Sequence, residues 1–242
     1  MRKTFLVLFC IAVFSTCKGE LPDTVAQRFS ASASLSFNSN GVNPIPSFSL
    51  GKPAVQANIS LSKGRFSYDP GLAYGVDAKP WYIDNWFHFI IINKPVFKLR
   101  TGINFSMFFS DKTVTGEKFL QGQRYWTGEL AGIFSLPSGY TLTMMYWSDN
   151  GQEHGTLTGH FISFSAEKND LALSNSLRLS AYIQLFTIQY DQDNKGFFIT
   201  PRIALSEKHL PLSLFFQATQ PLVTRIKPNP GFQWDIGVSY SF

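Results

Sequence analysis

The chain alternates apolar and polar residues at every second position along most of its length. The clearest run ends the sequence, where small or polar residues separate six apolar or aromatic ones: Phe232, Trp234, Ile236, Val238, Tyr240 and Phe242. A period of two predicts a β-strand with one apolar face and one polar face. The pattern therefore predicts an all-β protein.

Twelve runs of this kind are separated by turn residues such as Ser62-Lys63-Gly64. The predicted strands are 28–38, 54–62, 65–76, 85–93, 96–109, 123–136, 140–148, 156–167, 177–190, 197–206, 211–219 and 231–242. We expect them to close into one antiparallel barrel domain over 28–242, with Asp69-Pro70-Gly71 as an irregularity in the third strand. Two alternatives stay open: ten strands if 65–76 or 85–93 is misread, and fourteen if Ile45–Leu50 adds a strand with a further partner.

The connections differ in length between the two ends of this barrel. If the first strand leads outward, the outer connections are 39–53, 77–84, 110–122, 149–155, 191–196 and 220–230, and the inner ones are 63–64, 94–95, 137–139, 168–176 and 207–210. The outer set is longer on the whole, which is typical of transmembrane β-barrels.

The terminal strand resembles the last strand of bacterial outer-membrane β-barrels, because an aromatic residue, Phe242, closes an alternating aromatic run. The resemblance implies an integral outer-membrane protein in contact with lipid, whose residues Phe232 to Phe242 are recognised by the barrel-assembly machinery. The segments SKGRFSYDP and FKLRTGINFSMFF are similar to small barrels of Bacteroidota-type envelopes. The family suggests no transported solute.

The other end of the chain predicts export. Arg2 and Lys3 precede an apolar run from Phe5 to Phe14, and small or polar residues follow. This is the pattern of a signal peptide, and it is too short for a transmembrane helix. We expect a signal peptide over 1–19, cleaved after Gly19, and a short periplasmic lead over 20–27. Cys17 as a lipidated residue is the alternative.

Composition favours a membrane barrel over other all-β classes. Aromatic residues make up 16% of the chain and charged residues 15%. The formal net charge of +5 falls to +2 without residues 1–19, and no basic cluster argues for nucleic acid. Both cysteines, Cys10 and Cys17, lie in the predicted signal peptide, so the mature chain has neither a disulfide nor a thiolate metal site.

The polar faces predict a hydrated lumen, because an Arg facing lipid at mid-bilayer would cost roughly 2–4 kcal/mol. The lumen-lining candidates are Arg65, Asp69, Lys98, Arg100, Asn104, Glu129, Arg178, Gln184, Arg202 and Asp235. Twelve strands spaced about 4.8 Å apart leave a lumen of at most roughly 12 Å once side chains are counted. These candidates contain more bases than acids, so we predict a narrow diffusion channel for small solutes with a weak anion preference.

Two other interpretations of the barrel stay open. The inward charges could pair across the lumen and close it, with an Arg bound to Glu129 or Asp235. A non-conducting barrel would then act in adhesion or as a scaffold through outer loops 39–53, 110–122 and 220–230. Aromatic residues near strand ends are expected to form interfacial girdles, apart from some that pack beneath loops: Trp81, Tyr82, Trp86, Tyr125, Trp126, Tyr140, Tyr146, Trp147, Trp234 and Tyr240.

The sequence argues against catalysis. Some outer-membrane barrels are lipid hydrolases with a Ser–His pair, which makes this a remote alternative. Here His160 stands at odd spacing from Ser163 and Ser165, so on a strand the histidine and the serines face opposite sides. His154 has no nucleophile beside it, and no third ligand joins His154 and His160 in a metal site. We predict no catalytic residues, no metal and no cofactor.

Overall fold

The computed structural model describes residues 28–154, 156 and 158–242. The predicted signal peptide, both alternatives at Gly19 and Cys17, and the lead over 20–27 lie outside the described residues. The rest of the predicted barrel domain can be compared with the structure strand by strand.

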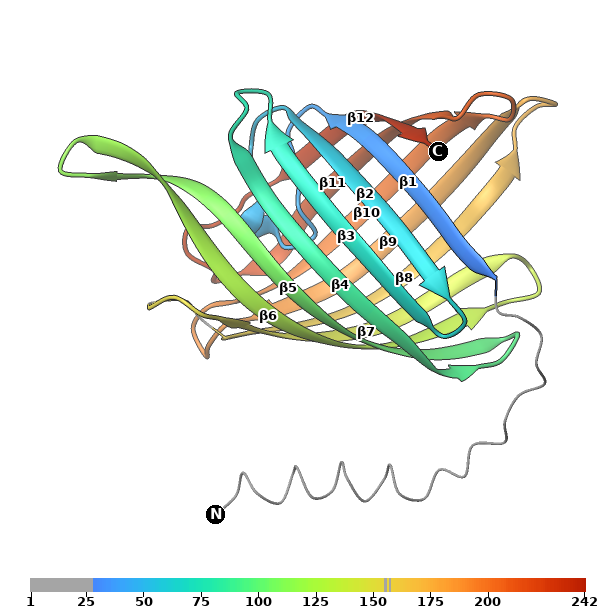
Figure 1. Ribbon diagram of the computed structural model, residues 1–242, viewed down its shortest axis with the longest axis horizontal. Coiled ribbons are helices and arrows are strands. Elements are labelled where there is room, and N and C mark those ends of the chain that lie inside the picture. Colours follow the sequence, from blue (N-terminus) through green and yellow to red (C-terminus); the bar gives the residue numbers. More distant parts are fainter. Residues whose placement is uncertain (1–27, 155, 157) are drawn as a thin grey trace, which may run out of the picture.

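The described residues form one closed antiparallel barrel of twelve strands (Figure 1). Its strands are β1 (Phe29–Asn38), β2 (Ala54–Lys63), β3 (Phe66–Gly75), β4 (Pro80–Asn93), β5 (Phe97–Val114), β6 (Glu117–Ser135), β7 (Tyr140–Gly151), β8 (Thr158–Ala172), β9 (Leu177–Gln189), β10 (Lys195–Glu207), β11 (Leu212–Thr224) and β12 (Gln233–Ser241). Each strand pairs with its neighbours in sequence, and β1 pairs with β12, where Ser34 lies opposite Ser241. The predicted fold class and strand count are confirmed.

Three strand boundaries differ from the sequence prediction in ways that affect the site. β4 begins at Pro80 rather than at 85, so Asp84 belongs to the barrel wall. β5 and β6 remain paired out to Val114 and Glu117, so the predicted loop 110–122 is mostly a β-hairpin, which projects beyond the other strands (Figure 1). The segment Ile45–Leu50 adds no strand, because it contains the short 3-10 helix η1 (Pro46–Phe48).

The third strand also differs from its prediction. Asp69, Pro70 and Gly71 pair with Trp86, Asn85 and Asp84 of β4 in unbroken register. The expected irregularity is therefore absent from the β3–β4 ladder but present on the β2 side, where the pairs pass from Asn58–Gly71 to Leu61–Tyr68 and skip Asp69 and Pro70. The β3–β4 register shifts instead between Ala73 and Tyr74, close to the end of the strand.

The two ends of the barrel are distinct. The turn end carries the short connections, such as Gly64-Arg65 between β2 and β3, and the loop end carries segment 39–53, the β5–β6 hairpin and segment 225–232. Both Gly64 and Gly139 have positive φ angles of 64° and 77°, which suit tight turns at the turn end.

The outer face of the barrel is apolar on every strand. Large side chains stand exposed on it, among them Phe66 at 66%, Met144 at 62% and Ile203 at 51%. In water such a continuous belt would be a severe aggregation hazard, whereas acyl chains would satisfy it. Among the described residues, no helix has the length and hydropathy needed to span a bilayer.

The inner face alternates with this belt and is largely polar. In β1 and β2 it consists mainly of small polar side chains, and register places Ser34 opposite Asn58 and Ser36 opposite Gln56. Towards the loop end it also holds two apolar clusters: one of Phe161, Phe186, Ile188, Phe198 and Ile226, the other of Ala54, Ala73, Trp81 and Tyr82. The lumen is therefore polar over much of its wall and filled with apolar side chains at particular places.

Candidate functional site in the barrel lumen

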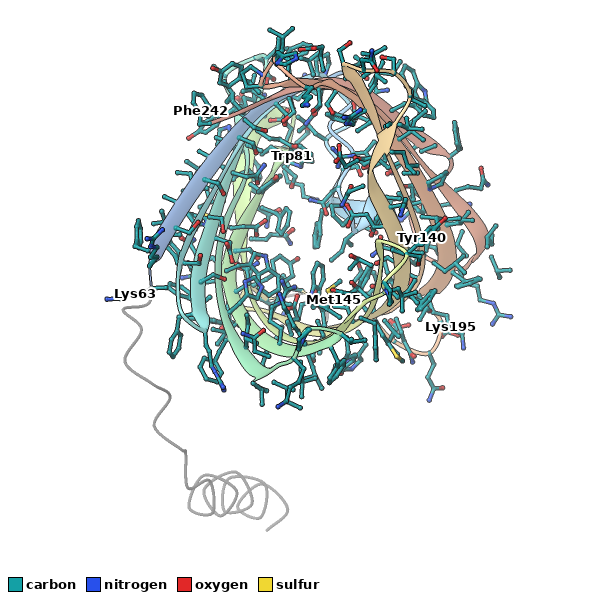
Figure 2. All side chains as sticks on the ribbon, turned by 90° about the vertical axis from the view of Figure 1, so that its right-hand side faces the viewer. Lys63, Trp81, Tyr140, Met145, Lys195 and Phe242 are labelled. Carbon is teal, nitrogen blue, oxygen red and sulfur yellow. The ribbon has the colours of Figure 1, made fainter. Side chains whose placement is uncertain are left out.

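Segment 39–53 folds into the barrel instead of covering it from outside. In the view along the barrel axis, its light-blue ribbon lies within the ring of strands (Figure 2). Gly41 and Gly51 have φ angles of 54° and 69°, so the chain turns at both ends of the segment where other residues would be strained. The backbone N–H of Leu50 donates to the carbonyl of Gly41 at 2.9 Å and closes the base of the loop. We call residues 39–53 the inner loop.

Asp235 holds the start of the inner loop. Its carboxylate accepts hydrogen bonds from the Ser39 hydroxyl at 3.0 Å, the Asn40 backbone N–H at 2.9 Å and the Val42 backbone N–H at 3.4 Å. The side chain is almost fully buried, so this carboxylate replaces its water with loop donors. Its place in the lumen agrees with the predicted inward direction, but its hydrogen-bond donors are the Ser39 hydroxyl and two backbone N–H groups of the loop, and not an arginine.

The tip of the inner loop crosses the lumen and packs against the wall. The Trp81 indole N–H donates to the Phe48 carbonyl at 2.8 Å, and the Phe48 ring stacks on Phe108 with centroids 4.2 Å apart. Ile45 contacts the first apolar cluster and Leu50 contacts the second. The loop thus bridges both clusters, and the lumen is narrowed by backbone and apolar side chains.

A second tie fixes the far end of the inner loop at the loop end of the barrel. Lys52 Nζ lies 2.6 Å from Asp77 Oδ2, and both side chains are partly exposed. The hydrogen bond from Lys52 holds the pKa of the Asp77 carboxyl below its usual range. The pair links the inner loop to the β3–β4 connection.

The sequence-predicted lumen residues fall into two groups. Register and alternation place nine of them on the inner face: Asp69, Lys98, Arg100, Asn104, Glu129, Arg178, Gln184, Arg202 and Asp235. Arg65 lies in the exposed turn between β2 and β3, and its guanidinium donates to the Ile91 carbonyl at 3.2 Å. The structure therefore places Arg65 at the turn end, outside the lumen wall.

A belt of charged groups lies on β3 to β6. His88 Nδ1 lies 2.7 Å from Asp69 Oδ2, and His88 Nε2 lies 3.6 Å from Glu129 Oε1. Arg100 Nε donates to Glu129 Oε1 at 2.8 Å, and the Trp147 indole N–H donates to Glu129 Oε2 at 2.9 Å. All these pairs join residues on the same wall, so they leave the lumen unblocked. A further ion pair, between Arg178 Nε and Asp170 Oδ1 at 3.1 Å, also joins two neighbouring strands, β9 and β8.

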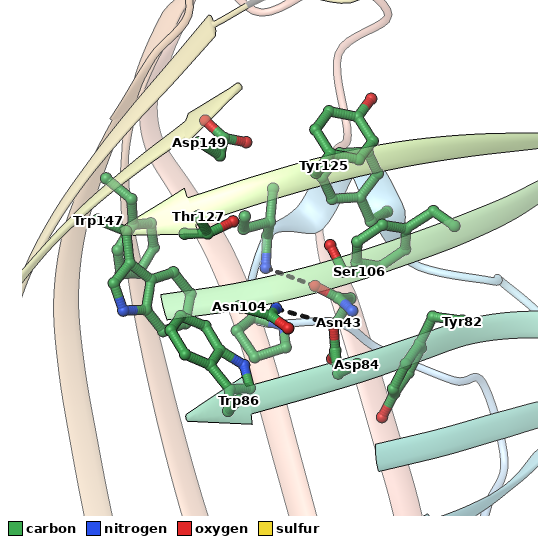
Figure 3. Close-up of a pocket in the computed structure, with 15 residues that line it drawn as sticks. Asn43, Tyr82, Asp84, Trp86, Asn104, Ser106, Tyr125, Thr127, Trp147 and Asp149 are labelled. Atoms are coloured by element: carbon green, nitrogen blue, oxygen red, sulfur yellow. Dashed lines mark hydrogen bonds between the residues drawn. The ribbon is translucent and has the colours of Figure 1, made fainter. Parts of the chain in front are cut away.

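The inner loop borders a cavity on the β4–β8 wall (Figure 3). The cavity has a volume of about 180 Å³. Its aromatic lining includes Trp86, Tyr125 and Trp147, and its carboxylates are Asp84 and Asp149. We call this space the aromatic cavity.

A larger space lies against the adjoining wall, formed by β8 to β11. It has a volume of about 460 Å³ and is lined by polar groups that include Glu167, Tyr182, Gln184 and Arg202. Pro44 of the inner loop borders both this space and the aromatic cavity. The inner loop therefore stands between two parts of the lumen. We call the larger part the polar passage.

Several inward residues escaped sequence reasoning. Asp84 and Asp149 fell in predicted loops because β4 and β7 are longer than expected, and Glu167 was not singled out although it shares the inner face with Ser163 and Ser165. Alternation along the strands was the available signal, because residues an even number of positions apart lie on the same face of a strand. Asp84 lies on the same face as His88, and Asp149 on the same face as Trp147.

Half of the aromatic residues assigned to interfacial girdles are inside the barrel. Trp126, Tyr140, Tyr146, Trp234 and Tyr240 are exposed on the outer face, as a girdle requires. The girdle prediction is wrong for five others, which lie on the inner face or beneath the inner loop: Trp81, Tyr82, Trp86, Tyr125 and Trp147. The position of an aromatic residue near a strand end does not show whether its ring lies on the inner or the outer face of the barrel, whereas its place in the alternation along the strand does.

The histidines occupy separate environments. His160 lies on the outer face, where its Nδ1 is 2.9 Å from the Tyr146 hydroxyl oxygen, while Ser163 is buried on the inner face. The predicted separation of His160 from the nearby serines is thus observed. Within the described residues, no group of three or more His, Cys, Asp or Glu side chains is arranged to hold a metal ion.

The chain matches no protein-family model and no curated protein in sequence. Its fold is similar to solved structures of outer-membrane proteins. The KdgM porin in complex with disordered oligogalacturonate is 11% identical, with a TM-score of 0.57 over 87% of this chain and 99% of that chain. LpxR from Salmonella typhimurium is 8% identical, with a TM-score of 0.52 over 87% and 99% of the two chains.

An outer-membrane channel from Pseudomonas putida F1 is also 8% identical, with a TM-score of 0.51 over 92% of this chain and 99% of that chain. At these identities the likeness concerns the fold alone. The fold is that of outer-membrane β-barrel proteins, as the terminal strand suggested. The closer resemblance to Bacteroidota-type barrels stays a prediction.

Proposed function

We propose that the protein is an integral outer-membrane channel for passive diffusion of small solutes, narrowed by the inner loop. One observation carries the proposal: a polar inner wall with the polar passage of 460 Å³ on one side of the loop. An adhesion barrel would have no need of a hydrated passage beside a built constriction. The similar porin and channel folds support the same assignment.

The selectivity we propose is a weak preference for cations, opposite in sign to the prediction from sequence. The anion preference depended on more bases than acids on the inner face, and the structure reverses that balance. Within the described strands, the inner-face acids are Asp69, Asp84, Glu129, Asp149, Glu167 and Asp235, and the bases are Lys98, Arg100, Arg178 and Arg202. The excess of carboxylates over the whole inner face makes the potential of the lumen more negative and raises its cation concentration, while the polar passage itself carries one acid, Glu167, and one base, Arg202.

Planar-bilayer conductance tests the channel. The informative variant replaces residues 42–50 with a short Gly-Ser link, which the adjacent ends of the inner loop permit. We expect larger conductance steps than in the wild type, because the obstruction is removed. The control shortens the β5–β6 hairpin between 111 and 120, outside the lumen, and should leave conductance unchanged. Silence of both the wild type and the loop variant, with folding verified by heat-modifiable migration, would refute the channel.

The proposed channel is not an enzyme. Its support is the separation of His160, on the outer face, from the inward Ser163 and Ser165. The similar structures are only 8% and 11% identical, so the fold alone does not distinguish a channel from other outer-membrane functions. Lipid hydrolysis by the purified barrel that is abolished by His160→Ala would contradict this assignment.

A scaffold or adhesion role is the second candidate, and one observation favours it: the β5–β6 hairpin projects well beyond the barrel (Figure 1). The other predicted binding loops are less suitable, because the inner loop lies in the lumen and 220–224 belongs to β11. Replacing 111–120 with an Asn-Gly turn should then abolish surface binding by cells that display the protein and leave barrel assembly intact. Undiminished binding would eliminate the hairpin as the adhesive element.

A further inference from the structure

The aromatic cavity has rigid walls. Trp86 and Trp147 lie with ring centroids 5.3 Å apart, and Trp86 also stacks on His88 at 5.2 Å. The Trp147 ring is held by its indole hydrogen bond to Glu129. On the side of the inner loop, the Phe48 ring meets the edge of Tyr125 at 5.3 Å. The rings are therefore positioned before any ligand enters, which limits the entropy lost on binding.

Two carboxylates of this cavity lack the partners that hold three of the other inner-face acids. Glu129 and Asp69 have ionic partners, and Asp235 accepts three loop hydrogen bonds. Among the described ion pairs, none includes Asp84 or Asp149. Asp84 accepts a hydrogen bond from the Asn104 side-chain amide at 3.1 Å, and Asp149 is accompanied by the Gly159 backbone N–H.

Burial makes this lack of a cation consequential. Asp149 is 8% exposed, whereas Asp84 is half-buried beside Asn104, which is 4% exposed. A Cβ at position 159 would overlap the Asp149 carboxylate, so the glycine there admits it. A carboxylate withdrawn from water is stabilised most by an opposite charge with hydrogen bonds, and the space beside both acids can hold one.

We infer that the aromatic cavity binds a small organic ammonium ion with an apolar or aromatic body. The ammonium would bind the buried Asp149 carboxylate, and Asp84 on β4, three strands away, would add negative potential. The Trp86 and Trp147 rings would contact the body and the charge, as aromatic faces do for cations. The inference deepens the proposed function, on which it rests, by naming the class of solute that the channel retains. A metal ion would use the carboxylates but has no apolar body to pack against the rings.

Isothermal titration calorimetry on the detergent-refolded full-length barrel tests the inference. The probes are phenethylammonium, neutral 2-phenylethanol and anionic phenylacetate, which share one aromatic body and differ in charge. We expect phenethylammonium to bind at least about tenfold more tightly than the other two. Equal affinity for all three, or no saturable binding of phenethylammonium, would overturn the inference.

Matched variants locate the site. Asp149→Asn should weaken phenethylammonium binding about tenfold, Asp84→Asn should weaken it less, and Trp86→Leu should weaken it as well. Glu167→Gln removes an inward carboxylate on the polar passage and should leave the affinity unchanged. Heat-modifiable migration and tryptophan emission without ligand identify any variant that fails to fold. An unchanged affinity in both folded aspartate variants would place the ligand elsewhere and refute the site.

The two proposals fail separately. A barrel that conducts but shows no preference for phenethylammonium retains the channel and loses the site. A barrel that binds phenethylammonium through Asp84 and Asp149 but never conducts retains the site and loses the channel.

Discussion

At the scale of single residues, Asp235 is the main attachment of the inner loop. Asp235→Asn replaces one acceptor oxygen with a donor, so at least one of the bonds from Ser39, Asn40 and Val42 is lost. We expect the free energy of unfolding to fall by about 1–3 kcal/mol and conductance noise to rise as the loop loosens. Denaturant titration followed by tryptophan fluorescence, with single-channel recording, measures both effects.

The control for this variant is Asp193→Asn, which changes the same functional group in the exposed β9–β10 connection. It should alter neither stability nor noise. Quiet, fully stable channels in Asp235→Asn would mean that the packing of Phe48 alone holds the inner loop.

Gly102 permits the charged belt. A Cβ at this position would lie 2.5 Å from His88 Cδ2, so Gly102→Ala must displace the imidazole from Asp69 and Glu129. We expect destabilisation of about 1–3 kcal/mol, measured by denaturant unfolding. Gly128→Ala is the matched control, since Gly128 lies on the neighbouring strand with open space around it. Equal stability of the two variants would show that His88 moves without cost.

At the scale of elements, the closing strand is the one that the sequence describes best. β12 pairs with β1 and β11, and the Phe242 backbone N–H donates to the Ala33 carbonyl at 2.9 Å. The exposed Phe242 side chain contributes little burial of its own, at 74% exposure. A strong effect of its replacement on assembly would therefore indicate recognition by the assembly machinery and not lost packing.

The corresponding prediction concerns Phe242→Asp. We expect far less heat-modifiable barrel in outer-membrane fractions, while the same purified chain still refolds in detergent. Phe66→Asp, on the outer face at similar exposure, is the control and should reduce membrane yield much less. A similar loss of membrane yield in both variants would indicate that any charge on the lipid-facing side of the barrel impairs assembly, without specific recognition of Phe242.

The strands were predictable from sequence because alternate residues face lipid and the hydrated lumen, which gives an alternation of apolar and polar residues. The residues of β12 show this alternation. The inner loop was not, because nothing local in Ile45–Leu50 distinguishes a segment that covers a mouth from one that enters it. Its path depends on Gln233 and Asp235, almost two hundred residues away in the chain. The inward direction of the Trp86 and Trp147 rings was also missed, because both residues were assigned to the girdles from their position near strand ends and not from the alternation along the strands.

At the scale of the whole molecule, the inner loop divides the lumen into unequal parts with different chemistry. The aromatic cavity of 180 Å³ is lined by rings, the buried Asp149 and the half-buried Asp84, whereas the polar passage of 460 Å³ has Glu167 and Arg202 on its wall. Retention and passage of solute can therefore occur at separate places. The size difference predicts that most ion flow follows the polar passage.

Reversal potentials in a salt gradient test this division. Glu167→Gln should shift selectivity towards anions and Arg202→Gln towards cations, because each removes one charge from the route that ions use. Asp149→Asn should change reversal potential much less, although it removes the same charge as Glu167→Gln, because its carboxylate faces the aromatic cavity. If Asp149→Asn instead produces the larger shift, ions cross on the side of Trp86 and Trp147. The inner loop would then direct solutes through the aromatic cavity, and retention and conduction would share one route.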